Sequence, residues 1–443
     1  MSKITIQIII SLIIITKIYL QEHKICTFKY KKEIPKEISS ENIFDFLYKN
    51  NIQITIDISN KHFKIPLNLK LRQYPFFFTS PEAYPNHQTF NFEESPSFMG
   101  NPQKLHFTAY DFLYGFKGND TIFINDVKLF QYNFFIGTKL RENIGESGSI
   151  GLNIEDPEVK YNDINFIYQL QGRNLVSTHE FTFKFINDDD GELIIGAKPH
   201  EYDKSHYKEE NYKSLKPYLG KYNNNYDIQI DGIYFNDVNV TEKEKNIVQL
   251  SIENGFIVGN INFYKEVKKD FFNKYLNTSE CFENYIQSQM FYFYNCNQNI
   301  NIRELKPISF YIESVNFTFQ LTYEDLFYKH DNSYYFLVVF KITGFDLKWV
   351  LGKPFLKKYQ FVFDQNSKLV GFYTEFIKPE KEIKWEIILY ILVGLLILIS
   401  IIFVIKKCLK CKKSRKIRSN KVKDAMKYIR HTDKSDGKNI LGI

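Results

Sequence analysis

The sequence predicts an all-β, antiparallel fold followed by one apolar helix near the C-terminal end. Apolar and polar residues alternate in Ile52–Ile56, Ile65–Leu71, Phe181–Phe185 and Phe317–Phe319. Alternation with a period of two is typical of half-buried strands. Turn motifs such as Asp188–Gly191 separate these runs. Many short strands joined by such turns indicate an antiparallel sheet protein.

The length of 443 residues exceeds what one simple core holds, so two or three domains are expected. Hydrophobic residues make up 44% of the chain, which is enough for a large core and excludes a disordered protein. Helical patterns are few in the β-rich region, and Tyr264–Tyr275 is the best candidate.

The N-terminal end resembles a secretory signal. Lys3 precedes the apolar run Ile4–Ile15, which has the length of a signal-peptide core. Residues 1–20 are therefore interpreted as a signal peptide, with an uncleaved anchor as the alternative. Residues 21–45 are polar and rich in Lys and Glu, and we interpret them as a presegment.

A second apolar run, residues 387–405, lies near the C-terminal end and contains no charge. Nineteen residues span about 28 Å as a helix, enough to cross a bilayer core. Residues 406–443 hold 14 Lys and Arg against three Asp, a net charge of +11. The positive flank predicts a single-pass type I protein with a cytosolic tail.

The charge of the tail accounts for the basic character of the whole chain. The net charge is +7, so the residues before the tail carry −4. A basic tail beside a span is attracted to an anionic inner leaflet. Nucleic-acid binding by the folded part is therefore not predicted.

The sequons and the cysteines are consistent with a chain that has one part outside the cytosol. Sequons begin at Asn119, Asn239, Asn277 and Asn316, all before the predicted span, and are candidate glycosylation sites. Cys26 has no obvious partner. The pair Cys408 and Cys411 adjoins the membrane in a basic run, which favours reversible palmitoylation over a zinc half-site or a redox pair.

The segment Trp349–Phe372 (WVLGKPFLKKYQFVFDQNSKLVGF) reads as an apolar strand ending in Gly, a short helical turn and a hairpin. It resembles the final segment of pepsin-like aspartic proteases, the A1 family. Other segments resemble parts of the same family in the same order: His87–Phe98, Phe107–Asp111, Gly148–Leu152, Phe181–Gly196, Tyr226–Ile233, Leu305–Phe310 and Val350–Gly352.

The resemblance implies a two-lobed pepsin-like fold with an interlobe cleft, with lobes at residues 46–205 and 206–376. It also implies a disulfide between Cys281 and Cys296, which an oxidising compartment favours. Tyr110 is the candidate flap tyrosine, followed by Asp111 where the family has Gly. The alternative for Tyr110 is a packed tyrosine of a strand.

The chemistry of this family requires two aspartates, each in an Asp-Thr-Gly or Asp-Ser-Gly loop. Two carboxylates that share one proton supply both the base and the acid. Neither motif occurs in the chain. In the first lobe, counting from Phe63 points to Asn68 and counting back from Ser80 points to Lys70. Between Lys64 and Ser80 there is no Asp or Glu.

In the second lobe, counting back from Phe263 points to Ser251, and a local match to the motif points to Glu253. We prefer Ser251. No catalytic pair is intact under either alignment. A nucleophilic Ser251 requires a base and an oxyanion hole, and no histidine lies in a recognisable motif.

Other catalytic chemistry is not predicted. We interpret His87, His106, His200 and His206 as surface or structural residues, and Asp188–Asp190 as a solvated turn rather than a calcium site. No metal site and no cofactor is expected.

The leading hypothesis is a membrane-anchored pepsin-like homologue that is catalytically inactive and binds polypeptide in its cleft. The second is an active membrane-bound aspartic endopeptidase that uses Glu253, and the third is a structural surface glycoprotein. The ectodomain is expected to be extracellular or lumenal. Enzyme activity is therefore an open question with absence favoured.

Overall fold

The computed structural model divides into two units, residues 1–377 and 378–443. It describes 13 stretches of the first unit and six single residues of the second. The stretches are 24–33, 43–71, 76–85, 88–102, 106–107, 113–124, 127–140, 147–154, 162–219, 225–241, 246–286, 290–341 and 349–375; the single residues are 394, 402, 422, 423, 425 and 426.

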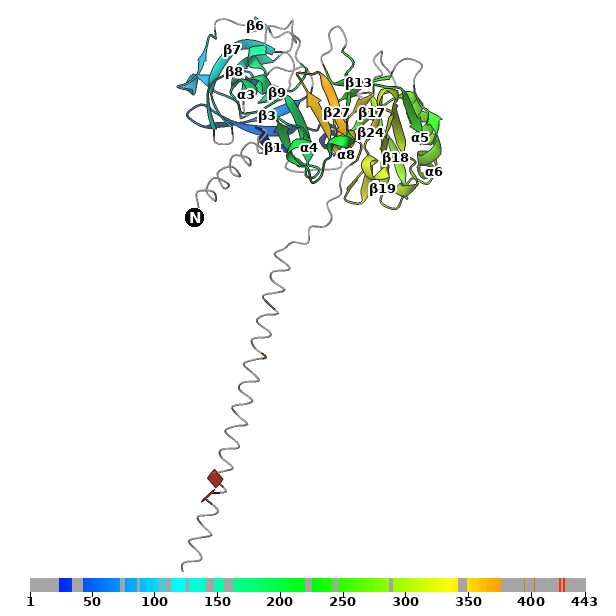
Figure 1. The fold of residues 1–443 in the computed structure, drawn as a ribbon. Coiled ribbons are helices and arrows are strands. Elements are labelled where there is room, and N and C mark those ends of the chain that lie inside the picture. The colour runs from blue at the N-terminus through cyan, green and yellow to red at the C-terminus, as the bar shows by residue number, and fades with distance from the viewer. Residues whose placement is uncertain are drawn as a thin grey trace, which may run out of the picture. The chain divides into compact units, whose positions relative to one another are not determined.

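A run of six strands links the two lobes within the first unit (Figure 1). The link itself is the antiparallel pairing of β10 with β26, in which Phe181 lies opposite Phe363. The strands, in spatial order, are β12 (Tyr212–Leu215), β27 (Leu369–Tyr373), β26 (Phe361–Asp364), β10 (Glu180–Phe185), β11 (Asp190–Ile195) and β1 (Cys26–Lys32).

The first lobe continues the same 14-stranded sheet beyond β1. Its strands are β2 (Ile52–Ile58), β3 (Phe63–Lys70), β9 (Gly148–Gly151), β4 (Phe77–Thr79), β8 (Val127–Leu140), β7 (Leu113–Ile124), β5 (Met99–Gly100) and β6 (His106–Phe107). Its short helices are α2 (Ile43–Tyr48), α3 (Phe166–Gly172) and the 3₁₀ turns Phe92–Glu94 and Asn162–Ile164.

The second lobe holds a nine-stranded and a four-stranded sheet. The larger contains β13 (Asp227–Ile230), β16 (Asn246–Leu250), β25 (Val350–Leu351), β17 (Ile257–Gly259), β24 (Val338–Lys341), β19 (Phe291–Asn297), β23 (Ser333–Phe336), β22 (Phe327–His330) and β18 (Cys281–Ile286). The smaller contains β15 (Val238–Asn239), β14 (Gly232–Phe235), β20 (Ile308–Ile312) and β21 (Phe317–Leu321).

Helices in and around the second lobe are short. They are α4 (Pro199–Tyr202), α5 (Ile261–Val267), the π-helical turn Lys268–Phe272, α6 (Asn273–Asn277), α7 (Tyr323–Leu326), α8 (Lys353–Lys358) and the 3₁₀ turns Glu209–Asn211, Ile302–Glu304 and Glu313–Val315. The predicted helix Tyr264–Tyr275 is confirmed as the succession of α5, the π-helical turn and α6.

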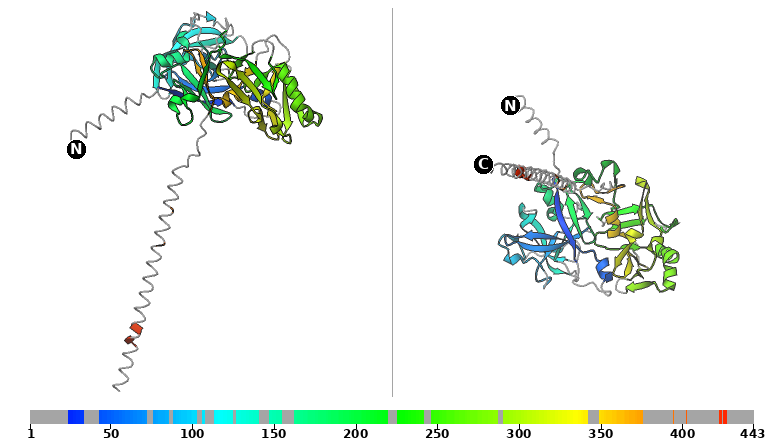
Figure 2. Two further views of the ribbon diagram at one scale, coloured as in Figure 1. Left: turned by 45° about the vertical axis from the view of Figure 1, so that its right-hand side comes forward. Right: turned by 90° about the horizontal axis from the view of Figure 1, so that it is seen from below.

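Alternating apolar residues form the core, as the sequence predicts. In β2 the side chains of Ile52, Ile54, Ile56 and Ile58 are buried, and the residues between them are not. A cluster of buried residues runs through both lobes. The mainly β architecture is therefore confirmed, and the lobes remain distinct in two further views (Figure 2).

The predicted presegment contains a structural element. Residues 26–32 form β1, which pairs with β11 along its length and with β2 at its end. Cys26, Phe28 and Tyr30 point into the core. Cys26 is a buried free thiol, and burial raises its pKa to about 11. This part of residues 21–45 is thus a central strand of the fold.

The described residues include no helix long and apolar enough to cross a membrane. The predicted signal peptide, residues 1–20, lies outside the described part of the chain. So do Cys408, Cys411 and nearly all of the predicted span, residues 387–405.

The four sequons differ in accessibility. Asn239, Asn277 and Asn316 are exposed. Asn119 is half-buried in β7, between β5 and β8, and its side-chain oxygen is buried. The structure thus makes Asn119 a poorer glycan acceptor than the sequence predicts.

Candidate functional site

The first lobe contains a strand threaded between two others. β9 pairs in parallel with β3 on one side and antiparallel with β4 on the other. β4 in turn pairs in parallel with β8. β9 therefore lies between β3 and β4, and residues 72–75 of the first loop, which joins these two strands in the sequence, lie outside the described residues.

The second lobe repeats this arrangement. β25 pairs in parallel with β16 and antiparallel with β17, and β17 pairs in parallel with β24. The chain between β16 and β17 forms the second loop, residues 251–256. β9 and β25 lie in two of the segments, Gly148–Leu152 and Val350–Gly352, whose sequences resemble the pepsin-like family.

The hydrogen-bond register shows which residues of the two loops correspond. Lys70 lies opposite Gly151 in the parallel pair, and its carbonyl oxygen accepts the amide of Leu152 at 2.8 Å. In the second lobe the amide of Ser251 donates to the carbonyl of Leu351 at 3.1 Å. In a parallel ladder that bond places Ser251 opposite the residue after Leu351, which is a glycine. Lys70 and Ser251 thus occupy equivalent positions.

The alternative candidate of the first lobe lies two positions earlier. Asn68 pairs with Ser149 in β9, so its counterpart in the second lobe is Gln249, opposite Val350. Asn68 is 3% exposed, and its buried Oδ1 has no hydrogen-bond partner among the described residues. Asn68 therefore lies within the strand, before the loop begins.

Ser251 is completely buried and belongs to a small polar cluster. Its Oγ donates to Glu253 Oε2 at 2.8 Å and accepts from Asn254 Nδ2 at 3.0 Å. Glu253 is half-buried. The carboxylate of this loop therefore acts as a hydrogen-bond acceptor for Ser251, two residues away.

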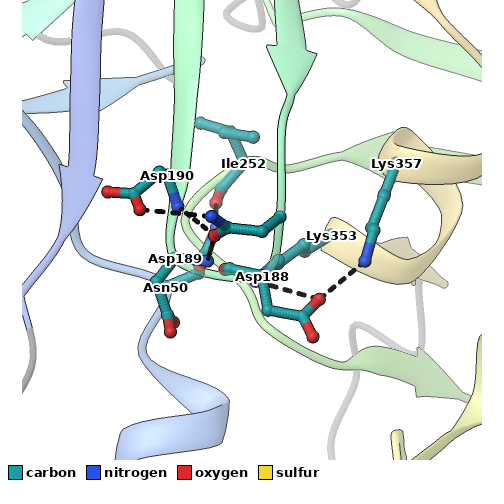
Figure 3. A network of polar contacts seen from close by, with 8 residues as sticks. Asn50, Asp188, Asp189, Asp190, Ile252, Lys353 and Lys357 are labelled. Carbon is teal, nitrogen blue, oxygen red and sulfur yellow. Dashed lines mark hydrogen bonds and ion pairs between the residues drawn. The ribbon is translucent and has the colours of Figure 1, made fainter. Parts of the chain in front are cut away.

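Residues 48–50 of the first lobe form hydrogen bonds with the second loop. Asn50 donates its side-chain amide to Ile252 O at 2.7 Å and its backbone amide to Glu253 O at 2.9 Å. The amide of Gly255 donates to Tyr48 O at 2.8 Å. Figure 3 shows the contact of Asn50 with Ile252.

Gly255 is required at this contact. A Cβ atom at this position would lie 1.7 Å from the carbonyl oxygen of Leu47 in α2. A real Cβ cannot approach a backbone oxygen so closely, so any larger residue forces α2 and the loop apart. The second loop is thus fixed by its neighbour as well as by its own strand ladder.

The equivalent positions carry an ammonium group and a hydroxyl group, and neither carries a carboxyl group. Lys70 is half-buried. Ser251 has hydroxyl chemistry and no histidine partner among the described residues. An acid–base pair of carboxylates is therefore not assembled from Lys70 and Ser251.

The remaining site predictions concern a disulfide, a flap tyrosine and several histidines. The disulfide between Cys281 and Cys296 is confirmed and joins opposite residues of β18 and β19. Tyr110 lies outside the described residues, as do Asp111 and His87.

Two of the predicted structural histidines make local contacts. His200 Nδ1 lies 2.7 Å from Tyr373 Oη, and burial lowers the His200 pKa. His206 Nδ1 lies 2.6 Å from Asp203 Oδ1. In the described part of the chain, no group of acidic, cysteine or histidine side chains has the arrangement of a metal site.

A buried carboxylate that the sequence analysis missed lies in the first lobe. Asp120 accepts hydrogen bonds from Ser95 Oγ at 2.6 Å, Ser97 Oγ at 2.5 Å and the amide of Thr121 at 2.6 Å. It stabilises the segment before β5. Nothing in the local sequence distinguishes it from a surface aspartate, because its serine partners lie more than 20 residues away.

Comparison with known proteins agrees with this architecture. The family model described as eukaryotic aspartyl protease matches residues 76–374. The matched range includes the second loop and begins after Lys70. No curated protein matches the chain. Since the family model covers more than half of the chain, the protein belongs to the eukaryotic aspartyl protease family.

Proposed function

We propose that this protein is a catalytically inactive member of its family that binds polypeptide in the interlobe cleft. One observation carries the proposal: the strand register makes Lys70 and Ser251 equivalent, and neither has a carboxyl group. Counting along the sequence leads to the same two residues as candidates for the positions where the family mechanism needs its two aspartates.

The physical argument is one of charge and proton affinity. Two neighbouring carboxylates share a proton, so one is a base while the other is an acid. An ammonium group at Lys70 is a cation where an anion is needed. The Ser251 hydroxyl does not give up its proton at the pH where a carboxyl does. Neither role of the pair is filled.

The scaffold for polypeptide binding does not depend on those carboxylates. Extended peptides bind exposed strand edges through backbone hydrogen bonds, with side-chain pockets adding specificity. The retained double-lobed fold supports this part of the proposal. The apolar run 387–405 and the basic residues that follow support a type I membrane anchor, with an extracellular or lumenal ectodomain and the tail on an anionic inner leaflet.

The test is a cleavage assay on the full chain, purified in detergent micelles. A denatured, unlabelled protein substrate is incubated with it across acid pH and the products are counted by mass spectrometry. We expect no cleavage above a blank. Cleavage that a pepstatin-type inhibitor abolishes would overturn the proposal.

One contact favours a second candidate function, an active endopeptidase. Ser251 is the residue that we prefer for the position of the second catalytic aspartate. Glu253 lies two residues after it in the second loop and accepts a hydrogen bond from its hydroxyl group. The Glu253→Gln variant tests this, with Glu313→Gln, an exposed glutamate, as the matched control. Activity lost only in Glu253→Gln would establish the active enzyme.

Binding is measured separately from cleavage. The full chain is immobilised and exposed to a library of extended peptides. Selective enrichment supports the cleft as a binding groove. A library that returns no binder would instead favour the structural surface glycoprotein.

A further inference from the structure

A pocket of about 280 Å³ lies where the tip of the β10–β11 hairpin meets α2, α7, β22 and α8. Lys32, Lys353, Lys357 and Lys358 supply lysine side chains to its lining. Phe46, Phe327, Leu337 and Pro354 supply apolar surface. This pocket, which we name the lysine pocket, is bordered by Gly255 of the second loop but contains neither Lys70 nor Ser251.

Lys32 is buried where the strand pattern calls for an apolar residue. In β1 the residues at positions 26, 28, 30 and 32 face the core, and the first three are Cys, Phe and Tyr. Lys32 is only 6% exposed. Lysines are almost never this buried without a partner. The strand therefore places a charge on the core face on which it otherwise buries apolar groups.

Among the described residues, no carboxylate lies within ion-pair distance of the Lys32 ammonium group. Its contact is with the ring of Phe46, whose centroid lies 3.7 Å from Nζ. A cation over a ring face is attracted to it, but the ring does not neutralise the charge. The neighbouring Lys357 differs, because its Nζ lies 2.7 Å from Asp188 Oδ1.

Lys353 is the other lysine of the lining that has no close ion pair with a carboxylate among the described residues. Its Nζ lies 4.0 Å from Asp188 Oδ1 and donates to the backbone oxygen of the same residue. Figure 3 shows Lys353 and Lys357 extending from α8 toward Asp188. The Asp188 carboxylate is thus shared by two lysines, and its contact with Lys357 is the closer one. Lys357 and Lys358 have close carboxylate partners in Asp188 and Asp325, whereas Lys353 has only the 4.0 Å contact with Asp188.

A buried, uncompensated charge is costly, and the cost falls when an anion binds beside it. Burial and the repulsion of Lys353 lower the pKa of Lys32 to about 8, against the opposing effect of Asp189 and Asp188. Burial likewise lowers the pKa of Lys353. Both groups would gain from an anionic ligand.

The surroundings select the kind of anion. Four carboxylates also line the pocket, those of Asp188, Asp189, Glu324 and Asp325, so they balance the four lysines of the lining and leave no excess positive charge for a dianion. The apolar walls suit a ligand with an apolar body. Since a cavity of about 150 Å³ holds benzene, this pocket has room for a ring that carries a short acidic chain.

We propose that the lysine pocket binds a small monocarboxylic acid, with the carboxylate at Lys32 and Lys353 and an apolar body against Phe46, Phe327 and Leu337. This site contains neither Lys70 nor Ser251, although Gly255 of the second loop borders it, and the proposal does not rest on the absence or presence of proteolysis.

The experiment uses 3-phenylpropanoate as the probe and the full chain in detergent micelles, with isothermal titration calorimetry at neutral pH. Lys32→Met removes the charge and keeps a flexible side chain of similar length. Lys29→Met, an exposed lysine of the same strand, is the matched control. We expect saturable binding that Lys32→Met weakens at least tenfold and Lys29→Met leaves unchanged.

Two further ligands keep the proposal falsifiable with the unmodified protein. The neutral 3-phenylpropanamide has the same body without the charge and is expected to bind at least tenfold more weakly. Inorganic sulfate, which is a dianion at neutral pH, tests the choice of a monoanion and is expected not to compete. Equal affinity for acid and amide, undiminished binding to Lys32→Met, or sulfate displacing the acid would each overturn the proposal.

Discussion

Replacing Lys32 by methionine tests the stability cost of the buried ammonium group. In the folded protein, burial and Lys353 on α8 lower the Lys32 pKa from its ordinary value near 10.5 to about 8, while Asp189 and Asp188 of the hairpin oppose the change. Such a lowering corresponds to about 3 kcal/mol of lost stability below the folded-state pKa. We therefore expect the ligand-free Lys32→Met variant to be more stable at neutral pH by about 2–3 kcal/mol.

The sign of the pH dependence follows from the same pKa values. Between about 8 and 10.5 the unfolded chain binds this proton and the folded protein releases it. Stability contributed by this site therefore rises with pH through that window. From pH 7 to about 9.5, the stability difference between variant and wild type should shrink by about 2 kcal/mol.

The assay is urea-induced unfolding followed by tryptophan fluorescence, since Trp349 is buried in the second lobe. Wild type, Lys32→Met and Lys29→Met are compared at each pH, and only the differences are interpreted. Titrating groups other than Lys29 and Lys32 cancel because they are common to all three proteins. A difference that does not change with pH would show that Lys32 is not the titrating group. A variant less stable than wild type at every pH would refute the buried, uncompensated charge.

The remaining predictions concern packing, a buried carboxylate and the disulfide. Gly255→Ala should release α2 from the second loop, because the new Cβ meets Leu47 O; faster hydrogen exchange in residues 43–50 checks this. Asp120→Ala removes three hydrogen bonds to a buried carboxylate and should cost about 3 kcal/mol in urea unfolding, whereas an unchanged midpoint would contradict it. Cys296→Ser opens the bridge to Cys281, 15 residues away, and should also cost about 3 kcal/mol; an unchanged melting temperature would contradict this.

Local sequence patterns were sufficient to predict the hairpins. Phe181–Gly196 forms β10 and β11, and Trp349–Phe372 forms β25, α8, β26 and most of β27, as predicted. These elements combine strict alternation with a turn or a glycine at a fixed place, so neighbouring residues determine them. The function of the turn was less predictable. Asp188 is exposed, as a turn residue should be, yet it bonds Lys357, which is 169 residues away.

The choice between Asn68 and Lys70 shows a limit of counting along a strand. The two residues differ by two positions, so they lie on the same face and no alternation pattern separates them. The hydrogen bonds to β9 separate them, since only Lys70 has the register that Ser251 has in the second lobe. Pairing between distant strands supplies this information, and the sequence contains no local trace of it.

Lys32 was overlooked because the residues around it are polar and were interpreted as a presegment. A period-two signal was present, however, in the apolar residues Cys26, Phe28 and Tyr30. A lysine that continues such a series is either at the end of a strand, where it reaches solvent, or buried in it. The tip of the β10–β11 hairpin decides between these, because Asp189 O accepts the Lys32 amide at 2.6 Å and the chain there covers the side chain. A charge that breaks an apolar series is therefore most informative where a distant hairpin closes over it.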